Sequence, residues 1–353
     1  MIYGVGFIGS GPGVSALHLP TVARLGAFEP RHVADAGSGR AAGLGERHGL
    51  RHSTGIDDLL DDPTVDVVAV CSPPHLHAEQ VLAAVEAGKR AVFCEKPLAV
   101  DAEEAEAVIA ACRATGTAVV VGTNHLFDPA WARAKHHLVA HGGRVQTFSA
   151  TVSLPPNGRY HELVSVPTDA NGGAGAPAGG RPLPDWDDPT IAAAVLRQLV
   201  LGLCIHDLPL LRDVAPHIDR VVYARPVSPL GYCLGLLAGD ILVQLTAVMQ
   251  PGGADALWRI SIGTDFDDLE VEFPPSFVHA GSAAVRVRSG AGPETRYLRA
   301  EEDGYEAEWR ALADLIEGRV AVEYDELLDD ARYSIDLADA VAASVLERTA
   351  VRP

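Results

Sequence analysis

The sequence predicts two domains: an α/β domain with a doubly wound parallel sheet over residues 1–124, and an α+β domain with a large open, mainly antiparallel sheet over residues 125–353. Three observations favour this. The chain has 353 residues, more than one compact core usually holds. Apolar runs alternate with helical segments over the first 120 residues. Short strands with period-two patterning follow later, several of them joined by short turns.

The first element is an apolar run, residues 3–8, that leads through a glycine-rich turn into a helical segment. Glycine permits backbone angles closed to other residues and lets a phosphate approach, while the helix N-terminus offers free N–H groups. The G-x-G-x-x-G/A pattern fits from Gly11, whereas from Gly9 it meets Val14 as its third small residue. An ordinary tight turn is the alternative. We predict a dinucleotide site at Gly9, Gly11, Pro12, Gly13 and Val14.

A second short strand, residues 31–35, ends in Asp35, about twenty residues past the glycines. An acid at this strand end accepts hydrogen bonds from ribose hydroxyls and repels a 2′-phosphate, which favours NAD over NADP. Ser38 and Arg40 could contact a 2′-phosphate, so NADP stays open. A turn-forming aspartate is the other interpretation.

Further parallel strands are predicted at residues 65–71, 90–94 and 117–122, with helices at 78–88 and 101–115; residues 53–60 look like the capped start of a helix. The carboxyl ends of such strands are where cofactors bind. We therefore assign to the cofactor site the residues at and after these ends: Cys71, Ser72, Pro73, His75, His77, Glu95, Lys96 and Asn124.

Beyond residue 124 the pattern changes. A helix is predicted at 129–141, a strand at 145–154, a helix at 189–214, seven short strands between 220 and 298, and helices at 304–317 and 325–349. Residues 155–184 are rich in Gly, Pro and Ala, and we expect a flexible loop there, because such a segment buries too little side chain to offset its ordering entropy.

Composition narrows the function classes. The formal net charge of -19 argues against nucleic acid or an anionic membrane as partner, which leaves a small ligand. No apolar run approaches the roughly 20 residues of a membrane span, and the five scattered cysteines indicate a reducing compartment. We expect a cytoplasmic protein. His137 and His141 have a spacing that can bind metal, but no further ligand is nearby in the sequence, and we expect no metal.

The tripeptide Glu95-Lys96-Pro97, taken with the glycine turn, Asp35, Pro73 and His77, resembles the Gfo/Idh/MocA oxidoreductases, named for glucose-fructose oxidoreductase, inositol dehydrogenase and a rhizopine-catabolism protein. The resemblance covers nearly the whole chain. It implies a Rossmann domain followed by an α/β domain whose open sheet is often used for oligomerisation, here as a homodimer or homotetramer.

The resemblance also implies catalytic roles for Lys96 and His206. A lysine that is partly desolvated beside the substrate oxygen would have a lowered pKa and could move a proton. In the family, an Asp four residues before the histidine completes the set, and Gly202 stands there in this chain. Asp207 could partly substitute, although helical rotation would point it away from His206. We interpret Trp258 as a core residue. The substrate-binding residues predicted are Lys96, His125, Tyr160, Arg197, Gln198 and His206.

The leading hypothesis is an NAD(P)-dependent oxidoreductase that moves a hydride to or from a secondary hydroxyl or ketone of a sugar, cyclitol or related polyol. Two alternatives stay open. The glycine at position 202 suggests a non-catalytic member that binds NAD(H) or a sugar. The third hypothesis is an enzyme that uses NAD transiently for a net non-redox step, epimerisation or elimination.

Overall fold

The computed structural model describes residues 1–141, 143–155, 183–250, 256–276, 278–290 and 292–350. Tyr160 and nearly all of the predicted loop at 155–184 lie outside these ranges. The described chain divides into two units. The first holds Met1–Asn124 together with Tyr305–Arg332, a segment that the sequence assigned to the second domain. The second holds the described residues between 125 and 304 and those from Tyr333 onward.

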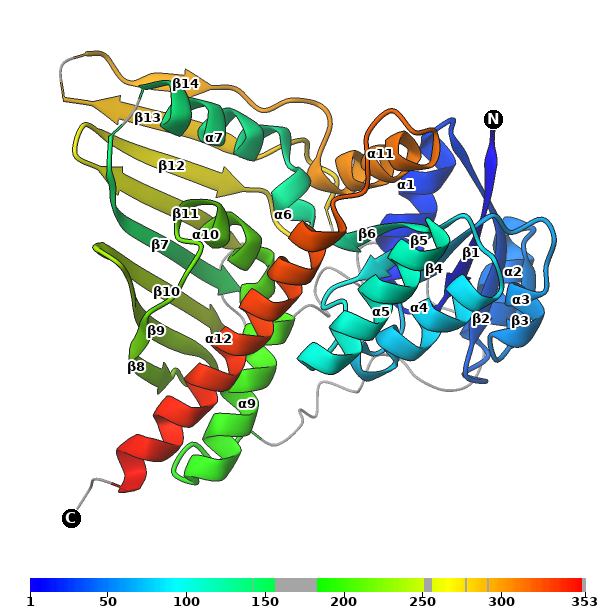
Figure 1. The fold of residues 1–353 in the computed structure, drawn as a ribbon, viewed down its shortest axis with the longest axis horizontal. Helices are drawn as coiled ribbons and strands as arrows, with labels where there is room; N and C mark the ends of the chain where they lie inside the picture. The colour runs from blue at the N-terminus through cyan, green and yellow to red at the C-terminus, as the bar shows by residue number, and fades with distance from the viewer. Residues whose placement is uncertain (142, 156–182, 251–255, 277, 291, 351–353) are drawn as a thin grey trace. The chain divides into compact units, whose positions relative to one another are not determined.

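The first unit is built on a six-stranded parallel sheet in the order β3-β2-β1-β4-β5-β6 (Figure 1). The order reverses between β1 and β4, and in such sheets ligands bind at the carboxyl ends of the strands near this point. All residues of β1 and β4 are buried, as expected of central parallel strands. The predicted doubly wound sheet is confirmed. Its strands are Tyr3–Ile8, Phe28–Asp35, Arg51–Thr54, Val67–Val70, Ala91–Glu95 and Ala118–Gly122.

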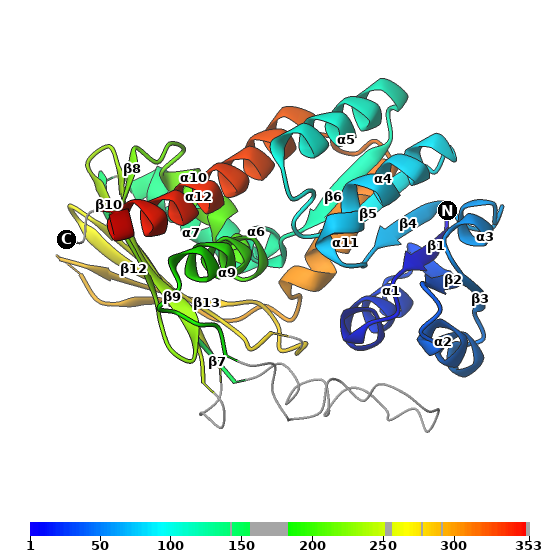
Figure 2. The same ribbon diagram turned by 90° about the horizontal axis from the view of Figure 1, so that it is seen from below.

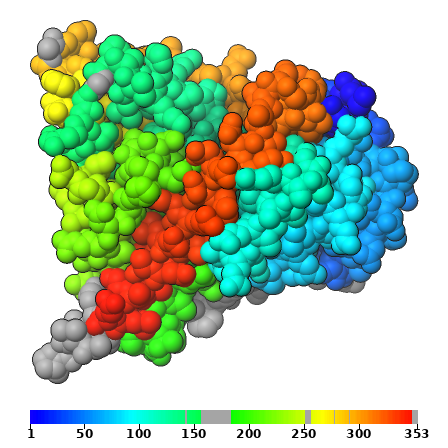
Figure 3. Space-filling view, in the orientation of Figure 1, coloured from blue at the N-terminus to red at the C-terminus, as the bar shows by residue number. Residues whose placement is uncertain are grey.

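Helices cover both faces of this sheet, with α4 and α5 on one side and α1 and α2 on the other (Figure 2). Helix α5 follows the predicted capping pattern: Asp101 accepts a hydrogen bond from the Glu104 N–H, and Gly116 ends the helix at φ 72°. The helix lies at the surface (Figure 3), and Glu103, Glu106 and Arg113 are among its exposed residues. The helices are α1 (Leu19–Arg24), α2 (Arg40–His48), α3 (Asp57–Leu60), α4 (His77–Glu86), α5 (Ala102–Thr115) and α11 (Gly304–Ile316).

One prediction in the first unit was wrong. Residues 53–60 were expected to begin a helix, but residues up to Thr54 form strand β3, which pairs in parallel with β2, and helix α3 starts only at Asp57. The strand is short and mostly exposed at the sheet edge. Its polar side chains therefore carry no period-two apolar signal.

The second unit contains an eight-stranded sheet in the order β14-β13-β12-β11-β7-β10-β9-β8. All neighbours pair antiparallel except β7 and β10, which run parallel. The predicted mainly antiparallel sheet is confirmed. Its strands are β7 (Val145–Leu154), β8 (Arg220–Pro226), β9 (Leu230–Ala238), β10 (Ile241–Met249), β11 (Leu257–Thr264), β12 (Asp267–Phe273), β13 (Ala284–Ser289) and β14 (Thr295–Tyr297).

Helices α7, α9 and α10 lie on one face of this sheet (Figure 1). Burial along β10 alternates, so that Val243 and Leu245 are buried while Leu242 is 59% exposed on the opposite face. The helices are α6 (Asn124–Phe127), α7 (Pro129–His141), α9 (Pro189–Gly202) and α10 (Leu208–Val214); the long helix α12 (Tyr324–Ala350) begins in the first unit and continues in the second.

The single helix predicted over residues 189–214 is interrupted. Helix α9 ends at Gly202, a 3₁₀ turn spans Cys204–His206, and α10 begins at Leu208. Pro209 lies in the first turn of α10, where its missing N–H is tolerated. His206 therefore ends a tight turn, not a helical face as predicted.

The window Pro189–His206 has a mean hydropathy of 1.5 over 18 residues, so by length and composition it could cross a membrane. In the structure 39% of this window is buried, and core helices of soluble proteins share this composition.

Candidate functional site

The glycine turn leaves open space above the end of β1. Gly9 has φ 117°, and a Cβ there would come within 2.5 Å of the Cys71 carbonyl oxygen, so this position needs glycine for the chain itself. A Cβ on Gly11 or Gly13 would meet no atom of the described residues within 4 Å. These two glycines leave room for a ligand at the start of the following helix, which fits a pyrophosphate.

The helix after this turn begins as a π-helix, Val14–His18, before α1 continues it. Such single π turns are rare and are frequent at functional sites. The turn places His18, which is 1% exposed, beneath the carboxyl end of the sheet, where its Nε2 lies 2.8 Å from Oε1 of Glu95. The sequence did not single out His18, although a lone histidine in an apolar helical run was a usable signal.

Asp35 holds the turn that follows β2. Its carboxylate accepts hydrogen bonds from Ser10 Oγ at 2.8 Å, the Gly37 N–H at 2.8 Å and the Ala41 N–H at 3.0 Å, and also from Ser38. Partial burial acts to raise the pKa of Asp35, but these bonds outweigh it and lower the pKa to about 2. The structure thus shows the turn-forming role. Binding of ribose by Asp35, Ser38 and Arg40 stays a prediction.

The loop after β4 is supported by His77. Its Nδ1 lies 2.6 Å from the Pro97 carbonyl and its Nε2 lies 2.8 Å from the Ser72 carbonyl. The ring is buried and ties the loop after β4 to the loop after β5, so in this arrangement it acts on the site through the two loops. Ser72 donates to Gln80, while Pro73 and His75 are exposed at the loop surface.

Glu95 and Lys96 lie where β5 ends, at the same edge of the sheet as the glycine turn. Trp309 Nε1 donates to Nδ1 of His18 at 3.3 Å. Because an indole N–H can only donate, His18 carries its proton on Nε2 and donates it to Glu95. Trp309 also stacks on Phe93 with ring centroids 4.6 Å apart. The first unit therefore holds the Glu95 carboxylate in one orientation.

Both ionisable groups of this segment have shifted pKa values. Burial lowers the pKa of Lys96 and outweighs the opposing charge of Glu95. Burial acts to raise the pKa of Glu95, but the His18 hydrogen bond and nearby positive charges lower it. An amine whose charged form is disfavoured by burial is suited to exchange a proton with a substrate, and shifted pKa values of this kind are frequent at functional sites.

The second unit brings two predicted histidines together. The rings of His125 and His206 have centroids 5.5 Å apart, and the Trp258 ring meets both edge-on, at 4.6 Å from His125 and 5.4 Å from His206. Asp207 is fully buried and accepts from Trp258 Nε1 at 2.7 Å and from His125 Nδ1 at 3.4 Å. Trp258 is a core residue as predicted, at 2% exposure, and it also contacts this cluster. Asp207 thus partners His125.

Two further residues predicted for the substrate site, Arg197 and Gln198, lie on helix α9. Arg197 forms an ion pair with Asp339 of helix α12 at 2.6 Å, and Gln198 is exposed on α9. Gly202 is exposed, and a Cβ there would meet no described atom within 4 Å. Among the described residues, therefore, no atom fills the space where a side chain at position 202 would begin. His137 bonds Asp267 at 2.8 Å, and within the described ranges no group of three His, Cys, Asp or Glu is placed to hold a metal.

The fold and this arrangement define a protein with a dinucleotide-binding unit and a second unit built on an open sheet. Residues 3–123 match the GFO_IDH_MocA model, described as an oxidoreductase family with an NAD-binding Rossmann fold, so this part of the chain belongs to the Gfo/Idh/MocA family. The resemblance inferred from the sequence is confirmed.

Named relatives extend the similarity. The chain is 34% identical over 294 residues to levoglucosan dehydrogenase of Pseudarthrobacter phenanthrenivorans, covering 78% of this chain and 62% of the relative. It is 39% identical over 163 residues to inositol 2-dehydrogenase 2 of Saccharopolyspora erythraea, covering 45% and 47%. The chain spans about half the length of the curated relatives that it matches.

Solved structures share the fold over the whole chain. A 3-ketoreductase from Actinomadura kijaniata, in complex with NADP and TDP-benzene, superposes with a TM-score of 0.73 at 20% identity, covering 98% of both chains. At this identity the likeness establishes the fold and no more.

Proposed function

We propose that the protein is an NAD(P)-dependent oxidoreductase that transfers hydride between nicotinamide and a secondary hydroxyl or ketone of a sugar, cyclitol or related polyol. The observation that carries this proposal is Lys96, an amine with a burial-lowered pKa at the carboxyl edge of a sheet whose family is described as NAD-binding. The levoglucosan and inositol dehydrogenases among the relatives support the substrate class.

In this proposal the turn at Gly9, Gly11 and Gly13 receives the pyrophosphate, and Lys96 exchanges the proton of the reacting hydroxyl with assistance from His206. When bound, the nicotinamide ring supplies the hydride acceptor or donor. Burial disfavours the charged amine and lowers the pKa of Lys96, so the amine gives up its proton more readily than an exposed lysine does. The charge of Glu95, whose carboxylate is held by His18, opposes this lowering of the Lys96 pKa.

We propose NAD as the main cofactor, because the Asp35 carboxylate stays ionised at the end of β2 and would repel a 2′-phosphate. The 3-ketoreductase with the same fold was crystallised with NADP, and Ser38 and Arg40 keep that cofactor open for this chain. A cytoplasmic location and a homodimer or homotetramer formed through the eight-stranded sheet belong to the same proposal, supported by the cysteine pattern and by the exposed face of β10.

The proposal is tested by binding and turnover together. NADH and NADPH binding is measured by fluorescence, and hydride transfer is followed at 340 nm over a panel of polyols and keto-sugars. Lys96→Met, which keeps the length of the side chain, is expected to lower kcat by about 10²–10⁴-fold with little change in NADH affinity. Lys135→Met is the matched control, because Lys135 is half exposed and pairs with Asp213 in the second unit.

The results separate the competing functions. Wild-type rates in Lys96→Met would remove the assigned proton transfer. Tight NADH binding without turnover of any substrate would favour the non-catalytic alternative, which the open position at Gly202 motivates. A product formed without net change in NADH would indicate a non-redox reaction.

A further inference from the structure

The Glu95 carboxylate is held at both of its oxygens. Oε1 lies 2.8 Å from Nε2 of His18, which is 1% exposed, and Oε2 accepts the backbone N–H of Lys96 at 3.2 Å. The Glu95 side chain is itself 27% exposed, so without these bonds the carboxylate would be free to turn toward solvent. A buried ring and the neighbouring amide therefore keep its negative charge beside Lys96.

The proton that His18 directs at Glu95 depends on Trp309. The indole N–H lies 3.3 Å from Nδ1 of His18, and an indole nitrogen can only donate. Nδ1 must then keep its lone pair, which places the ring proton on Nε2, opposite Glu95. A neutral ring with its proton on Nδ1 would oppose the indole N–H and turn the Nε2 lone pair toward the carboxylate. The indole thus selects the tautomer that binds Glu95.

Trp309 comes from helix α11, in the C-terminal segment that belongs to the first unit. Its side chain is 0% exposed, and its ring stacks on Phe93 with planes 5° apart and meets Phe28 edge-on with centroids 5.2 Å apart. The ring accounts for this packing, but a buried indole N–H needs an acceptor. His18 is that acceptor, so Trp309 combines packing with the orientation of a polar group.

We propose that Trp309 and His18 are positioning residues for Lys96, because together they hold an ionised Glu95 carboxylate beside its amine. This inference rests on the proposed function and deepens it. In oxidation the neutral amine takes the hydroxyl proton while the electron pair of the carbinol C–H bond leaves as hydride to the nicotinamide. In reduction the ammonium returns that proton. The C-terminal segment of the first unit thus contributes to the proton step by acting through Glu95.

The charges around Glu95 determine the direction of the expected pH effect. Burial lowers the pKa of Lys96, and the charge of Glu95 opposes this. Burial acts to raise the pKa of Glu95, but the bond to His18 and the charges of His18, Lys96 and His77 lower it. A change that displaces or neutralises the Glu95 carboxylate should therefore lower the pKa of Lys96 further.

The other ionisable groups at this position do not reverse that direction. Burial raises the pKa of the thiols of Cys71 and Cys94, which lie within electrostatic range of Glu95, so both are uncharged at neutral pH. Glu308 of α11 is 1% exposed and acts on Cys71. None of these three groups is changed by the substitutions below, so their effect is the same in every variant.

The first test measures the Lys96 amine directly, in the full-length protein without cofactor. The chain has three lysines, Lys89, Lys96 and Lys135, so ¹³C labelling at Cε gives few signals, and Lys96→Met assigns the one of interest. Glu95→Gln should lower the pH midpoint of the Lys96 signal by about 1–3 units, because it removes a neighbouring charge. Trp309→Phe keeps a ring for stacking but removes the N–H. It should lower the midpoint by about 0.4–1 unit, the equivalent of one ordinary hydrogen bond.

A double variant separates action through Glu95 from general damage to the core. In the Glu95→Gln background no carboxylate remains to be oriented, so adding Trp309→Phe should not move the Lys96 midpoint further. Trp131→Phe is the matched control. Trp131 is 1% exposed and also donates its indole N–H, at 2.8 Å to Asp213 in the second unit. Its substitution should leave the Lys96 midpoint unchanged.

Two further readouts would not respond to a loss of packing alone. Long-range ¹H–¹⁵N correlation should show His18 with its proton on Nε2 in the wild type and a loss of this preference in Trp309→Phe. In turnover assays the limb of the pH profile that depends on Lys96 should move to lower pH in Trp309→Phe and in Glu95→Gln, in the same order as the amine midpoints.

The inference is overturned if the Lys96 midpoint is unchanged in Trp309→Phe, or if the shifts simply add in the double variant, since Trp309 would then serve packing only. A neutral His18 with its proton on Nδ1 in the wild type would overturn it as well. Failure of the wild type to bind NADH or NADPH, with the midpoint shifts present, would instead contradict the proposed function, because the amine titration requires no cofactor.

Discussion

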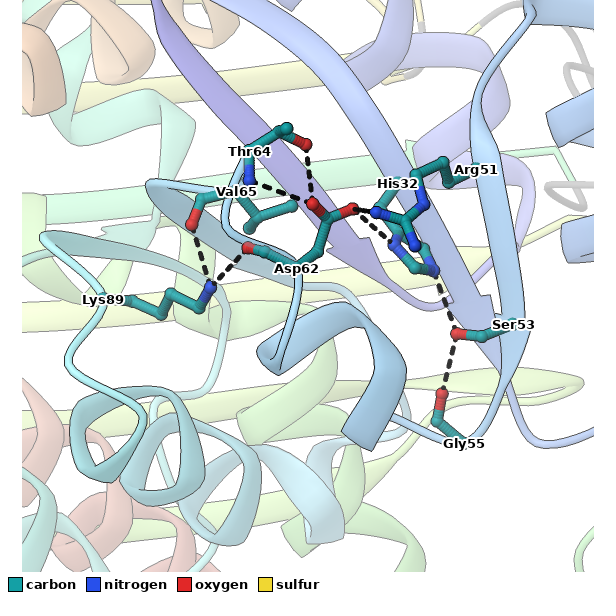
Figure 4. A network of polar contacts seen from close by, with 8 residues as sticks. All are labelled: His32, Arg51, Ser53, Gly55, Asp62, Thr64, Val65 and Lys89. Atoms are coloured by element: carbon teal, nitrogen blue, oxygen red, sulfur yellow. Dashed lines mark hydrogen bonds and ion pairs between the residues drawn. The ribbon is translucent and has the colours of Figure 1, made fainter.

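The two edges of the parallel sheet each contain a lysine with a lowered pKa, and the contrast between the two separates a structural role from a chemical one. Burial lowers the pKa of Lys89 and of Lys96 alike. Lys89 precedes β5 and donates to the carbonyls of Asp62 at 3.1 Å and Val65 at 2.9 Å (Figure 4). Lys96 follows β5, at the edge where ligands bind in such sheets. A lowered lysine pKa alone therefore does not identify a catalytic residue.

The ion network at the amino edge is complete in itself. Asp62 Oδ1 accepts from the Thr64 N–H and hydroxyl, and Oδ2 accepts from His32 Nδ1 at 3.1 Å and from Arg51 at 3.0 Å (Figure 4). His32 Nε2 also lies 3.1 Å from the Ser53 hydroxyl oxygen, and this hydroxyl lies within hydrogen-bond distance of the Gly55 carbonyl. Each oxygen of the Asp62 carboxylate is hydrogen-bonded, so this network holds the loop before β4 and leaves nothing for a ligand.

The largest effects that we expect are opposite effects on stability and on kcat when Lys89 and Lys96 are each replaced by methionine. Lys89→Met should lower the free energy of unfolding by about 2–4 kcal/mol, because two buried carbonyls lose their donor, while the kcat of the remaining folded protein stays within about twofold. Lys96→Met should show the reverse, a large loss of kcat with a small change in stability. Urea unfolding and steady-state kinetics on both variants measure this. Equal loss of activity in both would mean that the two lysines do not differ in role.

The Asp62 network should also make stability depend on acid pH. Hydrogen bonds from Thr64 and His32 outweigh the effect of burial and lower the Asp62 pKa from 3.8 to about 2. A folded-state pKa below the unfolded value stabilises the protein above about pH 4, and this stabilisation disappears as the pH falls toward 2. Its size is about 2 kcal/mol. Asp62→Asn should flatten this part of the stability profile, as measured by urea midpoints between pH 2 and pH 5; an unchanged slope would refute the assignment to Asp62.

The fold could be predicted closely because its elements carry strong local signals. Strands buried on both faces are apolar throughout, and strands such as β7 and β10, which are buried on one face, alternate in hydrophobicity. Asp101 marks the start of α5 because its side chain accepts a hydrogen bond from a free backbone N–H. Strand β3 could not be recognised, since it is polar and its pairing with β2 is non-local. Pro209 was a signal for the break between α9 and α10, but the apolar residues around it led to the prediction of one continuous helix.

The site was predictable as a set of residue types and less so as a set of partners. Glu95 and Lys96 are recognisable as a tripeptide with Pro97, but the bond of Glu95 to His18 joins residues 77 positions apart. The hydrogen bond between Asp207 and His125 joins residues 82 positions apart. Asp207 follows the turn at Cys204–His206 and His125 lies in helix α6, and no periodic pattern in the sequence connects these two segments. The sequence suggested that Asp207 could partly substitute for the family aspartate but would point away from His206, and it did not identify His125 as the partner of Asp207.

The smallest effect that we expect concerns Asp35, the carboxyl-edge counterpart of Asp62. Both carboxylates are held by several hydrogen bonds and both have a pKa of about 2, but Asp35 lies at the end of β2 on the proposed cofactor side. Asp35→Asn removes its charge and disturbs the turn, since an amide nitrogen must then face the donors of Gly37 or Ala41. The disturbed turn should weaken both cofactors, while the lost charge should favour NADP alone. We therefore expect the ratio of kcat/KM for NADP to that for NAD to rise about tenfold, or about 1.4 kcal/mol, in steady-state assays with both cofactors. A ratio that stays at the wild-type value would mean that Asp35 shapes the turn as Asp62 shapes its loop, without selecting the cofactor.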